Sequence, residues 1–182
     1  LRVASLGYAV PGTVLAIGML VPLAWFDDGA NAVIQAFGGA PRMVLMGSVT
    51  ALVVAYTLRF LAISAGGIEA GLTRIPRSLD QAAASLGKSP GAALRRVHLP
   101  LLAPAMAAAA LLVFVDTMKE LPATLLLRPL NFETLATWLY AEASRGTYEE
   151  GAVAALMIVL VGLLPVVLLA RTGQNFGRER LS

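Results

Sequence analysis

Three charged residues, Asp116, Lys119 and Glu120, lie close together at the end of an apolar run, where they could pair with one another or bind an ion. Asp116 and Glu120 are four residues apart, so on one helix they would share a face, with Lys119 beside them. Ionisable groups next to a membrane span rarely face lipid, and carboxylates suit a hard trivalent cation. Two interpretations follow: a local ion cluster that orients the end of the helix, or a polar lining at the outer mouth of a transport path.

The usual catalytic and metal-binding groups are scarce. The sequence has no cysteine, and its single histidine, His98, cannot build a multi-histidine metal site. Residues Gly87–Gly91 match the G-x-S-x-G pattern of serine hydrolases, but that motif follows a strand, whereas here a helix is expected before it. We therefore predict no catalytic residue, no certain metal ligand and no cofactor bound by this chain.

The stretch from Leu79 to Pro100 is predicted to form two short helices joined by a sharp turn. One apolar face at helical spacing comprises Leu79, Ala82, Ala83 and Leu86. Gly87 then stands where a helix ends, because glycine adopts a left-handed backbone easily. Ser89 and Pro90 supply a cap and a first-turn proline for the second helix. Periodicity alone leaves two roles open: a helix resting on the membrane surface, or a docking site for another protein.

Long apolar runs must position these groups. The chain is 58% hydrophobic and 14% charged, against about 45–50% and about 25% for a soluble domain. The apolar residues gather in four runs at about 8–26, 43–63, 101–117 and 152–170, which predicts an all-α, polytopic transmembrane bundle. We expect Asp27, Asp28 and Gly29 to end the first span, and the small residues of 103–110 to pack against another helix.

Arg59 lies inside the second predicted span. A charge there must either snorkel to the interface or pair inside the bundle, and its place near the predicted end of the span favours snorkelling. The following residues, 64–100, are expected to form a polar, basic loop.

Basic residues indicate the orientation. The 64–100 loop holds Arg74, Arg77, Lys88, Arg95 and Arg96, and the C-terminal tail holds Arg171, Arg178 and Arg180. Four crossings put the N-terminus, this loop and the C-terminus on one side, which the excess of arginine marks as cytoplasmic. The chain begins at Leu1 without a cleavable signal, so we interpret 1–182 as a fragment of one transmembrane domain of a longer polypeptide.

The 79–100 stretch resembles the loop signature of binding-protein-dependent ABC transporter permeases: Glu-Ala-Ala, three residues, Gly, nine residues, Ile, one residue, Leu-Pro. The matching residues are Gln81, Ala82, Ala83, Gly87, Val97, Leu99 and Pro100. Gln81 replaces the usual glutamate, and Asp80 beside it could supply the acid. The resemblance implies a type I importer fold in which this stretch is a coupling helix. That helix docks on a dimer of cytoplasmic ATP-binding subunits, which use ATP and Mg²⁺.

Two further stretches resemble the ferric-iron permeases, which fuse two permease halves in one chain: Tyr8–Gly12 and Lys119–Pro129. This resemblance implies the C-terminal half of such a permease in the bacterial inner membrane. The implied partners are the other permease half, a periplasmic iron-binding protein and the lipid bilayer, with no nucleic acid. Related permeases carry thiamine, polyamines, phosphonates or sulfate, so the cargo is less secure than the class.

Two other classes compete with this interpretation. A secondary transporter or channel would need broken helices around a midplane site, and residues 11–12 could be such a break, but the loop signature would then be a coincidence. An intramembrane enzyme would need a metal or serine–histidine motif that the sequence lacks.

Overall fold

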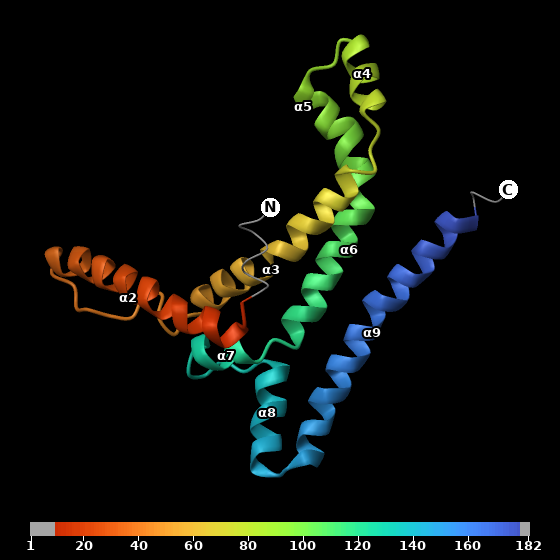
Figure 1. Ribbon diagram of the computed structural model, residues 1–182. Coiled ribbons are helices and arrows are strands. Elements are labelled where there is room, and N and C mark those ends of the chain that lie inside the picture. Colours follow the sequence, from red (N-terminus) through yellow and green to blue (C-terminus); the bar gives the residue numbers. More distant parts are fainter. Residues whose placement is uncertain (1–9, 179–182) are drawn as a thin grey trace.

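The computed structural model describes the backbone of residues 10–178 and the side chains of residues 10–167, and every regular element within them is a helix (Figure 1). The elements are α2 (Gly12–Ala36), α3 (Val49–Leu72), α4 (Arg77–Ser85), α5 (Pro90–Ala93), the π-helix η1 (Leu94–His98), α6 (Leu99–Met118), α7 (Pro122–Leu127), α8 (Leu135–Arg145) and α9 (Tyr148–Arg178). Four described stretches are long and apolar enough to cross a membrane: Gly12–Ala36, Val49–Leu72, Pro90–Met118 and Tyr148–Val167. The predicted all-helical chain with four candidate spans is confirmed.

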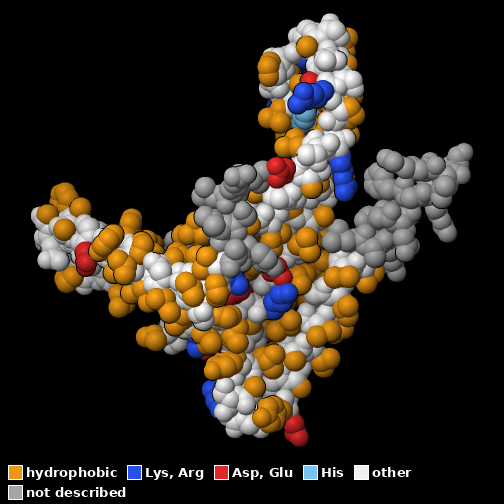
Figure 2. All heavy atoms as spheres, viewed as in Figure 1, with side chains coloured by type: hydrophobic (Ala, Val, Ile, Leu, Met, Phe, Trp, Pro, Cys, Tyr) orange, Lys and Arg blue, Asp and Glu red, His pale blue; other side chains and the backbone are white. Residues whose placement is uncertain are grey.

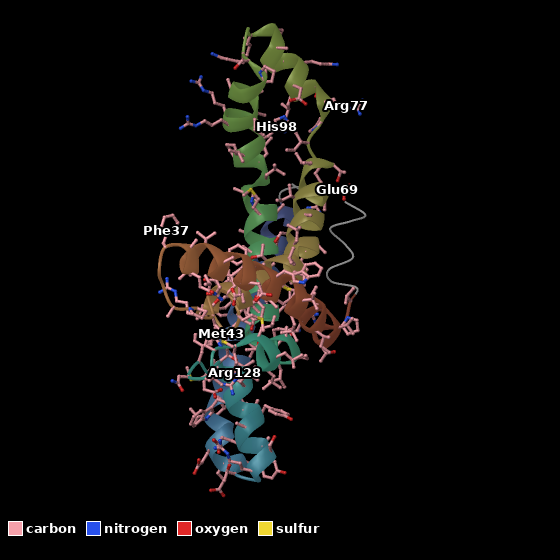
Figure 3. All side chains as sticks on the ribbon, turned by 90° about the vertical axis from the view of Figure 1, so that its left-hand side faces the viewer. Phe37, Met43, Glu69, Arg77, His98 and Arg128 are labelled. Carbon is pink, nitrogen blue, oxygen red and sulfur yellow. The ribbon has the colours of Figure 1, made fainter. Side chains whose placement is uncertain are left out.

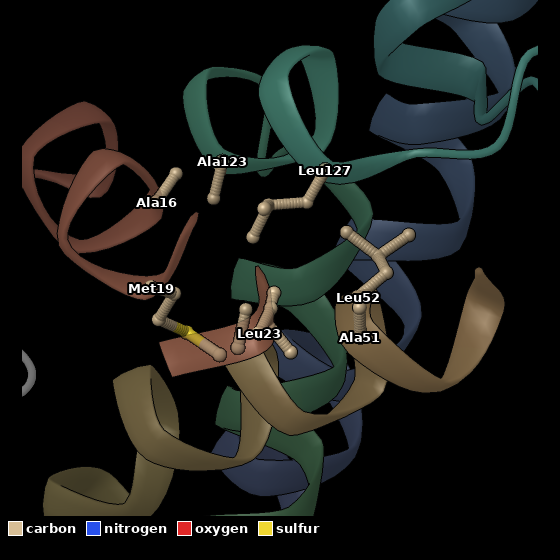
Figure 4. Packing of buried hydrophobic residues seen from close by; sticks show 8 residues of the cluster. Ala16, Met19, Leu23, Ala51, Leu52, Ala123 and Leu127 are labelled. Atoms are coloured by element: carbon tan, nitrogen blue, oxygen red, sulfur yellow. The ribbon is translucent and has the colours of Figure 1, made fainter. Parts of the chain in front are cut away.

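The buried core joins α2, α3 and α7 (Figure 4). Its members are Ala16, Met19, Leu23, Ala51, Leu52, Ala55, Ala123 and Leu127. Half of these are alanines, and such small side chains let membrane helices approach closely. Large apolar side chains elsewhere stay exposed, and Figure 2 shows hydrophobic side chains spread over the helical body. That distribution is typical of a chain whose outer surface meets lipid or other transmembrane helices.

The sequence predicted that the first span ends at Asp27–Gly29. This is wrong, because α2 continues to Ala36. The Asp27 side chain is buried, and its carboxylate accepts hydrogen bonds from the backbone N–H groups of Val44 (3.2 Å), Leu45 (2.7 Å) and Met46 (3.0 Å). These three donors compensate the charge, so the carboxylate fastens the following connector to the helix instead of stopping it. The prediction that α2's span begins at Tyr8 lies outside the described residues.

Helix α3 also extends beyond its predicted end and takes in residues 64–72, which were expected to be loop. Gly67 and Gly71 face α6, and a Cβ on Gly67 would lie 2.7 Å from the Ala109 Cβ. A Cβ on Gly71 would lie 2.8 Å from the Ala105 Cβ. These glycines of the expected loop are therefore a helix–helix contact, and the predicted packing of the alanine-rich 103–110 run is confirmed.

The stretch from Pro90 to Met118 forms one continuous helical rod of α5, η1 and α6 (Figure 1). The sequence predicted a boundary at Pro100, because proline removes a helical hydrogen bond and its ring clashes with the carbonyl four residues earlier. A π-turn precedes it, with the Leu99 N–H donating to the Leu94 carbonyl. This wider turn lets the helix pass Pro100 without ending.

Helices α8 and α9 form an antiparallel hairpin at the end of the molecule opposite α4 (Figure 1). Gly146 makes the turn in a left-handed conformation (φ 81°), and the buried Glu142 carboxylate accepts hydrogen bonds from Thr147 (2.5 Å) and Arg145 (2.7 Å). The last span therefore begins near Tyr148, earlier than the predicted 152. Arg171 and Arg178 fall where side chains are not described, and Arg180 lies outside the described residues.

Candidate functional site

A buried ion pair joins three segments at one edge of the core. The Arg59 Nε of α3 lies 2.9 Å from the Glu120 Oε2, in the connector that follows α6. The Arg59 and Glu120 side chains are 16% and 6% exposed. The Arg59 N–H at this nitrogen makes no well-directed hydrogen bond, so the contact is an ion pair rather than an aligned bond. The expectation that Arg59 snorkels to the interface is wrong, because its side chain pairs inside the protein. The residue lies near the middle of α3, with about 15 Å or more of helix on either side.

The start of α2 closes this ion pair from the third side. The Arg59 Nη1 donates to the Val10 carbonyl at 3.1 Å. Gly12 lies directly against the pair, since a Cβ built on it would be 2.7 Å from Glu120 Oε1 and 3.0 Å from Arg59 Nη1. Only a residue without a side chain leaves the pair undisturbed. The structure thus brings the described end of the Tyr8–Gly12 stretch against the Lys119–Pro129 stretch, and Arg59 links these two stretches, which carried the ferric-permease resemblance.

Glu120 also organises the start of α7. Its Oε1 accepts the Ala123 N–H at 3.1 Å, and its backbone carbonyl accepts the Thr124 hydroxyl at 2.7 Å. The Tyr56 hydroxyl of α3 bonds to the same Thr124 hydroxyl. Because Thr124 donates its single hydroxyl proton to the Glu120 carbonyl, the Tyr56 hydroxyl is the donor in its bond to Thr124. One acidic residue therefore holds α2, α3 and α7 in a fixed relation; we call Gly12, Arg59 and Glu120 the three-way joint.

The expectation that Asp116 and Glu120 share a helical face is wrong. Helix α6 ends at Met118, so Glu120 lies beyond it, and the four-residue spacing no longer places both carboxylates on one side. Asp116 instead pairs with Lys119 at 2.8 Å. The two interpretations separate accordingly: the Asp116–Lys119 pair lies at the helix end, whereas Glu120 belongs to the buried three-way joint.

Next along the chain, Arg128 anchors the turn between α7 and α8. Its Nη1 donates to the Phe132 carbonyl at 2.7 Å and pairs with the Glu133 carboxylate. The Thr137 hydroxyl donates to Glu133 at 2.7 Å, and this bond, with Arg128 beside it, holds the pKa of Glu133 below its ordinary value. The turn therefore keeps its charge pair at neutral pH.

The 79–100 stretch lies at the far end of the molecule from this joint (Figure 1). Helix α4 ends in a Schellman turn, in which the Gly87 N–H donates to the Ala84 carbonyl at 2.9 Å and the Lys88 N–H to the Ala83 carbonyl at 3.0 Å. Gly87 has the predicted left-handed conformation, with φ 68°. The Ser89 hydroxyl accepts the Ala92 N–H at 3.3 Å, so the G-x-S-x-G match is a helix cap.

The predicted signature residues occupy both arms of this turn. Gln81 and Ala82 are exposed on α4, whereas Ala83 is buried, and α4 contacts α5. Val97 is half-buried, and Leu99 and Pro100 are exposed on the rod. Asp80 on α4 contacts His98 on η1, the Oδ1 to Nε2 distance being 2.6 Å. The loop signature is thus a short helix folded back onto the start of a long rod.

Neither the joint nor the clamp made by Asp27 was predicted. Arg59 gave a signal, since a charge in an apolar run is expensive, but its distant partner gave none. The G-x-x-x-G spacing of Gly67 and Gly71 was readable from the sequence and was overlooked. Among the described side chains, no group of three or more His, Asp or Glu residues could hold a metal ion.

Comparison with known proteins assigns this architecture. The family of binding-protein-dependent transport system inner membrane components matches residues 1–176. An Fe(3+)-transport system permease protein of Haemophilus influenzae is 32% identical over 171 residues, which are 93% of this chain and 31% of that protein. A putative 2-aminoethylphosphonate transport system permease protein of Salmonella typhimurium is 29% identical over 171 residues, 94% of this chain and 59% of that protein.

A third relative, the ferric transport system permease protein of Actinobacillus pleuropneumoniae, is 27% identical over 161 residues, 88% of this chain and 21% of that protein. The chain therefore spans less than two thirds of each of these relatives.

Proposed function

Because this chain belongs to the family of binding-protein-dependent transport system inner membrane components, we propose that it forms part of the path through which an ATP-driven importer moves ferric iron. Members of this family are multi-pass transport components without a catalytic site of their own, and a separate subunit hydrolyses ATP. In this proposal a dimer of ATP-binding subunits docks at α4. A periplasmic iron-binding protein delivers the cargo, and a second permease half completes the path.

The observation that carries the proposal is the continuous rod between α4 and the three-way joint. A push on α4 reaches the rod through the tight Gly87 turn, and the rod runs without a break to Met118, two residues before Glu120. Glu120 in turn holds α2 and α3 through Arg59 and Gly12. Rigid elements in series are what alternating access requires, because motion of the ATPase must reach helices deep in the membrane.

Exposed apolar side chains on the α4 end support docking of a partner there. Leu86 is 74% exposed and Leu94 is 52% exposed, on either side of the Gly87 turn. Arginines and one lysine, Lys88, lie on the same projecting end (Figure 2). By the excess of positive charge, we place this end and both termini in the cytoplasm, and the α8–α9 turn outside.

Two cargoes compete within the same mechanism. Ferric iron is favoured by the 32% identity to an Fe(3+)-transport permease. A permease named for 2-aminoethylphosphonate is 29% identical and matches over more of its own length, so this phosphonate is the second candidate. Both oxygens of the Glu120 carboxylate are already engaged, one by Arg59 and one by the Ala123 N–H, so we do not expect Glu120 to hold iron as a ligand.

Transport by the complete system tests this proposal. The full-length permease would be reconstituted in proteoliposomes with its ATPase and its binding protein, with ⁵⁵Fe(III) and radiolabelled 2-aminoethylphosphonate as separate probes. We expect ATP-dependent uptake of ⁵⁵Fe(III) that vanadate abolishes. Uptake of the phosphonate but not of iron would show that the cargo is 2-aminoethylphosphonate, moved by the same ATP-driven mechanism. Uptake that continues under vanadate while an ion gradient is held would contradict the ATP-driven class and favour a secondary transporter.

Replacing Gly87 with alanine is expected to uncouple ATP hydrolysis from uptake. A Cβ at this position meets nothing within 4 Å, so the substitution introduces no clash, and only the left-handed backbone is penalised. That penalty is about 1–2 kcal/mol, enough to change the angle between α4 and the rod. The measurement is substrate taken up per ATP hydrolysed in the reconstituted complex.

Gly91 provides a matched control for this prediction. It lies in α5, its Cβ would also meet nothing within 4 Å, and its backbone is helical. Gly91→Ala should therefore leave the uptake ratio unchanged. Equal ratios for Gly87→Ala, Gly91→Ala and wild type would show that the turn does not set the coupling angle.

A further inference from the structure

One polar contact joins the two arms of the α4 end. Asp80, in the first turn of α4, meets His98, the last residue of η1, with 2.6 Å between Oδ1 and Nε2. The His98 side chain is 16% exposed and that of Asp80 is 53% exposed. Figure 3 labels His98 on the rod and Arg77 at the start of α4, on the arm beside it. Among the described residues, this is the only side-chain hydrogen bond between α4 and the helices that follow Gly87.

The chemistry of the two groups fixes the direction of this bond. An ionised carboxylate only accepts hydrogen bonds, so the His98 Nε2 carries the proton and donates it. The other ring nitrogen, Nδ1, is buried and has no hydrogen-bond partner among the described residues. The bond to Asp80 is therefore the one polar contact that the His98 side chain makes among the described residues, and apart from packing it is how His98 holds the α4 end together.

The position of the Asp80–His98 bond determines whether α4 and the rod move together. The Schellman turn at Gly87 ties one end of α4 to the rod, and residues 73–76 tie the other end to α3 rather than to the rod, so neither connection alone fixes the angle between α4 and the rod. Asp80 lies near the opposite end of α4. A second attachment there closes a triangle of α4, the turn and the rod, so that α4 and the rod move as one body.

We infer that Asp80 and His98 are positioning residues for coupling: their hydrogen bond locks α4 onto the α5–α6 rod so that a push on α4 reaches the membrane helices. This inference rests on the proposed function, because it concerns how the ATPase drives this chain. Without the bond, α4 would pivot about Gly87 and absorb part of the push. Losing a hydrogen bond to a charged group should lower the ratio of locked to unlocked α4 about fivefold or more.

Paired substitutions separate this lock from other roles of the two residues. Asp80→Ala removes the acceptor, whereas Asp80→Asn removes the charge but keeps a carbonyl oxygen that accepts from His98. A favourable interaction of Asp80 with the N-terminus of α4 depends on its charge, so both variants would lose it. On the other arm, His98→Gln keeps an N–H donor and His98→Leu removes it. The lock predicts that Asn and Gln behave like the native residues and that Ala and Leu do not.

A distance measurement tests the lock without knowledge of the cargo. Spin labels on cysteines introduced at Ala84 of α4 and Leu101 of α6, both exposed, would report the spacing of the two arms in the full-length permease by pulsed electron resonance. We expect one narrow distance distribution for the native residues, Asp80→Asn and His98→Gln. A broad distribution is expected for Asp80→Ala and His98→Leu. Narrow distributions in all five proteins would overturn the inference.

Transport measurements then test the consequence. In proteoliposomes with the ATPase and the binding protein, Asp80→Ala and His98→Leu should lower ⁵⁵Fe(III) uptake per ATP hydrolysed about fivefold, with Asp80→Asn and His98→Gln near wild type. Broad spin distances with an unchanged uptake ratio would also overturn the inference, because α4 would then be mobile without loss of coupling. If the wild-type complex transports neither ⁵⁵Fe(III) nor 2-aminoethylphosphonate, the proposed function fails, while the spin-label result still decides whether the lock exists.

Discussion

Replacing Arg59 with glutamine is expected to destabilise the protein by about 3–5 kcal/mol, the range for removing one partner of a buried ion pair. The buried Glu120 carboxylate would keep the Ala123 N–H and could accept from the introduced amide, but no cation would lie beside it. The segments that meet there, the start of α2 and the connector before α7, would lose their shared anchor. The measurement is the thermal midpoint of the purified full-length permease in detergent, followed by fluorescence-detected size exclusion.

The reciprocal change, Glu120→Gln, should lower uptake without disturbing docking of the ATPase. Glutamine leaves Arg59 without a countercharge in the core, and its amide has only one acceptor oxygen, so its NH₂ group must face either Arg59 or the Ala123 N–H, both of which are donors. Docking is expected to persist because α4 lies at the other end of the rod from Glu120 (Figure 1). Copurification of the ATPase with the variant permease measures docking, and ⁵⁵Fe(III) uptake measures transport.

The double variant Arg59→Gln with Glu120→Gln decides between a structural and a transport role. Two glutamines can hydrogen-bond to each other without charge, so stability should recover substantially. If uptake recovers with it, the ion pair only fastens the helices. If stability recovers and uptake does not, the charges themselves serve the transport path. A single Arg59→Gln variant with wild-type stability would show that the pair does not hold the joint.

The fold was largely predictable because its strongest signals are local. Charge-poor apolar runs predict membrane spans wherever they occur, and the glycine, serine and proline at 87, 89 and 90 specify a helix end and a helix start by backbone chemistry alone. The errors lie at span ends. Asp27 and residues 64–72 look like stops when each is considered alone. Both are helical because a distant segment compensates them: backbone donors at 44–46 for Asp27, and alanines of α6 for the glycines of α3.

The candidate site was less predictable because it depends on contacts between remote segments. Asp116 and Glu120 appeared to share a face only on the assumption that α6 continues past Met118. The Arg59 side chain could have met several acids, and the sequence does not indicate which one. By contrast, the 79–100 signature lies within one stretch of chain, so its turn could be placed at Gly87 from the sequence, although the lock between Asp80 and His98 could not.

Gly67→Ala is expected to separate α3 from α6 and to destabilise the protein by about 1–3 kcal/mol, the range for overpacking a tight contact. The new Cβ would be 2.7 Å from the Ala109 Cβ, which is attached directly to the α6 backbone and cannot rotate away. Only movement of a whole helix relieves the clash. Because α3 and α6 are the two helices that lead into the α4 end, we expect uptake per ATP hydrolysed to fall as well.

The neighbouring glycine makes the test specific. Gly66 lies in the same helix, but a Cβ on it meets nothing within 4 Å. Gly66→Ala should therefore be neutral, or stabilising by up to about 1 kcal/mol because alanine favours helix more than glycine does. Adding Ala109→Gly to Gly67→Ala removes the opposing methyl group and should restore both the thermal midpoint and the uptake ratio. Equal losses for Gly66→Ala and Gly67→Ala would mean that the backbone freedom of this region matters rather than its close contact with α6. Close contact with α6 predicts that only Gly67→Ala, of these two adjacent substitutions, destabilises the protein.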